Sequence, residues 1–274
     1  MSPVLEAFSE TLTKGACAVL GTSDPVEKCH LTRCIFNAWQ TGSVASIGEV
    51  RPPDHPARPE APLMLPPAQM PRRSTGSHQG RLHLIHALAH IELNAVDLAW
   101  DIIARFVAED MPKAFYDDWI QVAYDEAQHF EELAALLQRR GTFYGAFPAH
   151  GGLWQAAEKT AGSLEARLSI VPLVLEARGL DTTPAMIERL HDQNDAEFVD
   201  VLRMILNDEI THVAAGVRWL NFLAHRKGSA GQDVFQENVR RYHTGALKPP
   251  FNVVARDQAG FPESWYNALS FTLT

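Results

Sequence analysis

Four short stretches in the middle of the chain decide its fold. They are Glu92 within Ile91-Glu-Leu-Asn94, then Asp125-Glu-Ala-Gln-His129, then Glu176 within Leu175-Glu-Ala-Arg178, then Asp208-Glu-Ile-Thr-His212. In order they read Glu, Glu-x-x-His, Glu, Glu-x-x-His. Glu92 precedes Glu126 by 34 residues, and Glu176 precedes Glu209 by 33 residues. This repeat predicts two helical hairpins of similar length, each with one Glu and one Glu-x-x-His pair.

The residue types at these positions indicate a two-metal centre. Side chains at i and i+3 of a helix project together, so each Glu-x-x-His pair can bind one ion. Four converging carboxylates would repel one another, and two divalent ions would neutralise them. Carboxylate and imidazole ligands without thiolate suit iron or manganese, with zinc as a further option, and we prefer two iron ions. The predicted ligands are Glu92, Glu126, His129, Glu176, Glu209 and His212.

Two more Glu-x-x-His pairs occur, Glu27 to His30 and Glu188 to His191. Neither lies within a long apolar helical pattern, so we expect neither to bind metal. An aspartate precedes the Glu at both predicted sites, as Asp125 and Asp208, and at neither of the other two. A metal-bound His commonly donates its second N–H to a carboxylate, so Asp125 and Asp208 are predicted to orient the ligand histidines.

Several alternatives stay open at this point. Glu92 and Glu176 lie among apolar residues, and each could pair with Arg105 or Arg178, or face solvent, instead of binding metal. Glu158 and Glu165 compete with Glu176 for the same helix face. The remaining candidates are aromatic: three histidines are expected to pack against other segments, and three tyrosines could be core residues or redox partners. They are His83, His86, His90, Tyr116, Tyr124 and Tyr144.

The predicted fold class is all-α, with a ferritin-like type of four-helix bundle at 81–227. Long helices are expected at 81–108, 113–139 and 196–227. Gly141 should end the second helix, and a long crossover should follow to residue 152. The third arm, 153–191, should be helical with a break near Gly179, followed by a turn near Asp192.

Extensions flank the bundle on both sides. Residues 1–50 are expected to form an N-terminal helical extension, with helices at 3–20 and 26–40. Residues 51–80 hold eight prolines, which exclude regular helix and central strand, and predict a strap along the surface or a linker. Residues 228–274 form a C-terminal extension with a helix near 232–243. We expect Pro52–Pro71 or Lys248–Asn252 to border a pocket that leads to the metals.

Composition excludes several function classes. The net charge is −9 and the pI about 5.7, which argues against broad electrostatic binding to nucleic acid or anionic membranes. The three cysteines form no C-x-x-C motif, so a disulfide framework is not expected and a reducing compartment fits better. No secretory signal and no apolar run of membrane-spanning length is recognisable. These features predict a cytoplasmic protein that does not bind membranes.

The four motifs resemble those of the ferritin-like superfamily of di-iron carboxylate proteins. More closely, the chain is similar to a bacterial ferritin-like family of unknown function. That likeness includes His86-Ala-Leu-Ala-His-Ile-Glu-Leu93, Tyr144-Gly-Ala-Phe-Pro-Ala-His150 and Lys248-Pro-Pro-Phe-Asn252. The resemblance implies that Glu126 and Glu209 bridge the metals, that Glu92 and Glu176 are more terminal, and that His129 and His212 each bind one metal.

The superfamily hosts many activities, so three function classes follow from the resemblance. The first is an O2-activating oxidase or hydroxylase, whose unknown substrate is a small molecule or a macromolecule. The second is iron storage or buffering, and the third is a structural protein with a vestigial site. A tRNA-modifying hydroxylase is a variant of the first, although the acidic charge disfavours nucleic acid. We favour the first class, in a small homo-oligomer.

Overall fold

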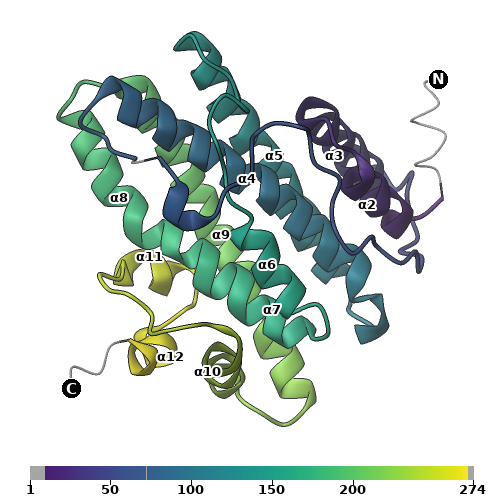
Figure 1. The fold of residues 1–274 in the computed structure, drawn as a ribbon. Helices are drawn as coiled ribbons and strands as arrows, with labels where there is room; N and C mark the ends of the chain where they lie inside the picture. Colours follow the sequence, from purple (N-terminus) through teal and green to yellow (C-terminus); the bar gives the residue numbers. More distant parts are fainter. Residues whose placement is uncertain (1–9, 72, 271–274) are drawn as a thin grey trace. The chain divides into compact units, whose positions relative to one another are not determined.

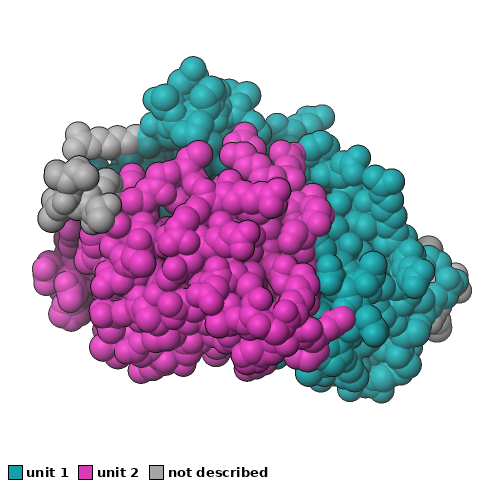
Figure 2. Space-filling model, turned by 90° about the horizontal axis from the view of Figure 1, so that it is seen from below, with its two compact units in different colours: residues 1–154 teal, residues 155–274 magenta. Residues whose placement is uncertain are grey.

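The chain is all-α, as predicted, in a computed structural model that describes residues 10–71 and 73–270. Within those residues, extended pairing is limited to two isolated bridges, Met64 with Ala149 and Leu247 with Ser270. The helices divide into two compact units, residues 1–154 and 155–274 (Figure 2). No described helix combines the length and the apolar character that crossing a membrane requires.

The first unit is built on two long helices that pack side by side, α4 (His78–Arg105) and α5 (Lys113–Arg139) (Figure 1). Helix α4 starts three residues earlier than expected, because the Ser77 side chain accepts a hydrogen bond from Gly80 N and caps it. A 3-10 turn, η2 (Val107–Glu109), leads into the connection between the two helices. Helix α5 has the predicted bounds, and Gly141 follows it with φ 77°, as a C-terminal glycine should.

Two shorter helices cover this pair. Helix α2 (Leu12–Gly21) packs on α4, and α3 (Pro25–Gln40) packs on α5. Part of the expected first helix, residues 3–9, lies outside the described residues. The described part begins at Leu12, because Thr11 has extended backbone and its hydroxyl accepts from Lys14 N. Helix α3 begins one residue earlier than expected, at Pro25, with the Asp24 carboxylate accepting from Glu27 N.

The proline-rich segment runs along α4 and is held there by hydrogen bonds. It contains one described 3-10 turn, η1 (Pro67–Gln69). Ala57 N donates to Leu20 O at 2.7 Å, and Arg105 Nη2 donates to Pro53 O at 2.9 Å. Farther along, Leu65 N donates to Ala149 O at 2.8 Å. Its backbone groups therefore find partners on several elements of the first unit.

The second unit contains the other hairpin. Helix α6 (Gly152–Lys159) spans the unit boundary after Trp154. Helix α7 (Leu164–Ile170), the π-helical segment η3 (Val171–Glu176) and α8 (Ala177–His191) then follow one another directly. After a turn with Asn194 at φ 55°, α9 (Ala196–Arg226) packs on α7, η3 and α8. The turn lies where the hairpin symmetry predicts it.

The expected helix break near Gly179 is wrong. Helix α8 continues through Gly179 and Pro184, and the chain is instead interrupted between Lys159 and Leu164. Pro184 has no N–H, so it leaves the carbonyl of Leu180 without its helical donor. Asn252 Nδ2 donates to that carbonyl at 3.1 Å, which lets the helix continue.

Three helices of the C-terminal extension pack within the second unit. Helix α10 (Gly231–Tyr242), close to the range expected, contacts α7 and α9, and α11 (Val253–Gln258) contacts α8 and α9. Helix α12 (Glu263–Tyr266) and the 3-10 turn η4 (Asn267–Leu269) lie against α10. Buried Arg256 fastens the extension to α8 through two hydrogen bonds to Asp181, at 2.8 and 2.9 Å.

Candidate metal centre

Three predicted ligands of the first unit come together between α4 and α5. His129 Nδ1 lies 3.4 Å from Glu126 Oε2 and 3.7 Å from Glu92 Oε2. The ligand atoms that Glu92, Glu126 and His129 offer all lie within 4.8 Å of one another. All three residues are buried, with Glu126 and His129 at 0% exposure. This buried cluster of carboxylates and imidazole could hold a metal ion.

The other buried acids of α4 have cationic partners, which the cluster lacks. Asp97 is paired with Lys28, and Asp101 with Arg105 at 2.6 Å. Within the described residues, Glu92 has no Lys or Arg within 4.0 Å, and its nearest cationic candidate is the His129 ring. Burial, and next the Glu126 carboxylate, raise the pKa of Glu92 to about 8. A bound cation would offset both effects, so the donor set fits a metal ion.

The second unit carries the matching residues on η3 and α9. Glu209 and His212 are buried on α9, and His212 Nδ1 lies 3.9 Å from Glu209 Oε2. The same two atoms face each other in the Glu126–His129 pair. Glu176 is half-buried and is the last residue of the π-helical segment, a kind of distortion frequently found at functional sites. Each unit therefore contains one Glu and one aligned Glu-x-x-His pair.

The acidic and histidine residues that were not chosen as ligands lie in other environments. Glu27, His30, Glu188 and His191 are exposed, and so is Glu158. Glu165 is paired with Lys227 at 2.8 Å. Arg105 binds Asp101, and Arg178 donates to Lys248 O at 2.6 Å and to Asp181 at 3.4 Å. The two arginines that could have neutralised Glu92 and Glu176 thus have partners of their own.

The two aspartates predicted to orient the histidines are half-buried. Asp125 accepts a hydrogen bond from Gln121 Nε2 at 2.8 Å, and the backbone carbonyl of Asp208 accepts from Thr211 Oγ1 at 2.7 Å. Neither contact involves a ligand histidine. The orienting role of Asp125 and Asp208 therefore stays a prediction, and so does the set of six ligands as a whole.

The histidines at the start of α4 pack against other segments, as expected. Gly145 N donates to His86 Nε2 at 2.9 Å, and His90 Nδ1 lies 2.8 Å from the Tyr144 hydroxyl. Burial lowers the pKa of His86 and of His90 to about 4, so both rings are neutral at pH 7. Burial also raises the pKa of the Tyr144 hydroxyl above its ordinary value.

A pocket in the first unit is bordered by the strap but by none of the predicted ligands, so the expected pocket that leads to the metals stays a prediction. On α4 it is lined by His90, Leu93, Asn94 and Asp97. At 100° per residue these four share one helix face, and Glu92 lies roughly opposite. The sequence could not reveal this pocket, because its other wall comes from residues 57–64 and Tyr144.

Comparison with known proteins places the chain in a family without assigning an activity. An uncharacterized protein of Haemophilus influenzae is 37% identical over 254 residues, which cover 89% of this chain and 88% of that protein. No solved structure matches the chain. A family model described as "Protein of unknown function (DUF455)" matches residues 21–267. With most of its length matched by that model and by this relative, the chain belongs to the DUF455 family.

Proposed function

We propose that this protein is a di-iron carboxylate enzyme that activates O2, as an oxidase or hydroxylase. In this proposal the two hairpins complete a ferritin-like four-helix bundle, and their six ligands hold two ions. The observation that carries the proposal is the matched pair of Glu-x-x-His motifs. In both, the Nδ1 atom of a buried His faces the Oε2 atom of a buried Glu on the same helix.

The resemblance to di-iron carboxylate proteins implies a role for each ligand. Glu126 and Glu209 would be shared by the two ions, His129 and His212 would hold one ion each, and Glu92 and Glu176 would be terminal ligands. A pair of iron ions would supply the electrons that reduction of O2 requires. The chain's own contribution is to hold the ligands among buried apolar side chains, which excludes water and competing reactions.

The extensions favour an enzyme over iron storage. The strap and the C-terminal segment are held by specific contacts, such as Arg105 on Pro53, Asn252 on Leu180 and Arg256 on Asp181. A storage cage has no need of such segments, whereas an enzyme needs walls around an oxidising centre. Iron storage or buffering is the competing function, and it makes a different prediction about iron content.

Metal analysis followed by O2 uptake tests the proposal. After anaerobic reconstitution with Fe(II), the protein should hold about two irons per chain and consume O2 when reduced, within a small oligomer. One ion or none per chain would refute the two-metal centre. A hollow particle that takes up hundreds of irons would establish storage instead. Two irons without O2 consumption would remove the oxygen-activating step while keeping the centre.

A further inference from the structure

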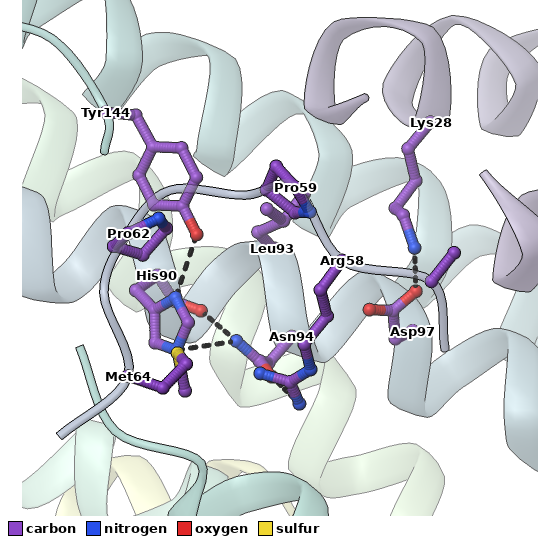
Figure 3. A pocket seen from close by; sticks show the side chains of 11 residues that line it. Lys28, Arg58, Pro59, Pro62, Met64, His90, Leu93, Asn94, Asp97 and Tyr144 are labelled. Carbon is purple, nitrogen blue, oxygen red and sulfur yellow. Dashed lines mark hydrogen bonds and ion pairs between the residues drawn. The ribbon is translucent and has the colours of Figure 1, made fainter. Parts of the chain in front are cut away.

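The strap-bordered pocket of the first unit has polar groups on one side and apolar groups on the other. Figure 3 shows Arg58, Asn94, His90 and Tyr144 as a connected set beside the Lys28–Asp97 pair. Arg58 Nη2 donates to Asn94 Oδ1 at 3.2 Å, and Asn94 Nδ2 lies 3.2 Å from His90 Nε2. The apolar side is formed by Pro59, Pro62, Met64 and Leu93.

Arg58 is a charged side chain of this pocket that has no counter-charge beside it among the described residues. Within the described residues its one hydrogen bond is to the neutral Asn94 side chain, and it has no carboxylate within 4.0 Å. A guanidinium has five N–H donors in a rigid fork that matches a carboxylate. Arg58 is half-buried, so water reaches those donors only in part. An anion that enters the pocket would find most of them available.

The remaining charges of the pocket set the charge of the ligand. The buried Lys28 ammonium donates a hydrogen bond to the Asp97 carboxylate, so these two side chains balance each other. His90 is neutral at pH 7, because burial and the nearby Arg58 lower its pKa. Tyr144 is neutral as well. One positive charge is left over, which suits a monoanion, whereas a dianion would also meet the Asp97 carboxylate.

The size of the pocket limits what part of a ligand it holds. Its volume is about 30 Å³, and a single water takes roughly 10–15 Å³ by the same measure. By that measure the space holds about two or three water-sized groups, which matches the carboxylate group at the end of a short aliphatic stem. The stem would contact the prolines and Met64, and the two oxygens would contact Arg58.

We propose that this pocket binds a small monocarboxylic acid in its anionic form, with Arg58 as the main carboxylate partner. None of the predicted metal ligands lines the pocket: on α4, Glu92 lies roughly opposite the pocket residues, and the other five lie on other elements. The proposal is therefore independent of the proposed iron centre. It gives the strap a function beyond covering α4, namely to carry the ligand-binding cation.

Saturation-transfer NMR with propionate tests the proposal on the full chain at constant ionic strength. Propionate should show a saturable signal, while propionamide, its neutral isostere, and inorganic phosphate should bind at least about tenfold more weakly. The substitution Arg58→Gln should weaken propionate binding by about tenfold or more, since it removes a charge-assisted bidentate contact. Arg51→Gln is the matched control, because Arg51 lies on the same strap but is exposed.

Three results would overturn the inference. They are no propionate signal at 10 mM, equal binding of propionamide or phosphate, and unchanged binding in Arg58→Gln. If Arg58→Gln does not fold, Arg58→Lys decides. That variant keeps the charge but loses the two parallel N–H donors of the guanidinium, so it should bind propionate measurably but more weakly than the parent. An affinity equal to the parent's would contradict the assignment to Arg58.

Discussion

At the residue scale, the first unit buries two kinds of ionisable group, acidic side chains and histidines. Asp97 and Asp101 keep cationic partners, Lys28 and Arg105, whereas Glu92 has a carboxylate and an imidazole beside it. His86 and His90 are instead buried in neutral form, held by Gly145 and Tyr144. A buried charge needs a counter-charge, and a buried neutral ring needs only its hydrogen bonds. The two groups should therefore respond differently to pH.

We predict that acid weakens the fold in part through His86. Its pKa is about 4 in the folded chain, against an ordinary value of 6.5, so below pH 6.5 the unfolded state binds the extra proton. The contribution of the neutral His86 ring to stability is therefore fully present above pH 6.5 and is lost as the pH falls toward 4. The variant His86→Gln keeps an acceptor for Gly145 N but does not titrate. Between pH 7.5 and 5.5 it should lose about 1 kcal/mol less unfolding free energy than the parent in urea titrations. An identical loss in both proteins would show that His86 is not buried as a neutral ring.

At the element scale, the π-helical segment depends on a glycine in the neighbouring helix. A Cβ built on Gly216 of α9 would lie 2.9 Å from Cβ and Cγ of Pro172, whose ring cannot rotate away. Gly179 of α8 has no heavy atom within 4 Å of the corresponding position. The same substitution should therefore have opposite effects at two helical glycines of one unit.

We predict that Gly216→Ala destabilises the protein by about 1–3 kcal/mol, because it overpacks the contact with Pro172. Gly179→Ala should be neutral or should stabilise by about 0.5–1 kcal/mol, since alanine suits a helix interior better than glycine. Denaturant titrations of both variants measure the difference. If Glu176 is a ligand, Gly216→Ala should also retain less metal, because η3 would have to move. Equal stabilities of the two variants would mean that η3 is not held by this close approach.

A second element-scale prediction concerns the proline inside α8. Asn252→Ala should cost about 1–2 kcal/mol, because it removes the donor to Leu180 O and the side-chain cap of α11. In a Pro184→Ala background residue 184 regains its N–H, which can bond to Leu180 O. There the cost of Asn252→Ala should be smaller by about 1 kcal/mol. A double-mutant cycle by chemical denaturation measures this coupling, and additive effects would contradict the compensation.

At the scale of the whole molecule, the proposed centre needs residues from both units. Because Glu126 and Glu209 are proposed to bridge, replacing either with Ala should remove most of both ions, as measured by elemental analysis of reconstituted protein. His30→Ala and His191→Ala are matched controls from the other two Glu-x-x-His motifs, and they should retain about two ions per chain. Loss of one ion in either control, with circular dichroism unchanged, would mean that the wrong motifs were chosen.

The sequence by itself determined the helices whose start and stop signals are local. Asp24 begins α3, Gly141 follows α5, and the spacing of Glu126 and His129 puts both side chains on one helix face. These features depend on residues a few positions apart, which a sequence shows directly.

Only the tertiary structure decided the features that depend on distant partners. Gly179 and Pro184 predicted a break, yet α8 continues because Asn252, 68 residues after Pro184, takes over the missing hydrogen bond. Arg58 gave no local signal either, since the pocket it enters joins the strap, α4 and Tyr144. A proline's missing donor and an arginine's missing counter-charge are local facts. What satisfies them is set by which segments the fold brings into contact, and that is a property of the packed chain.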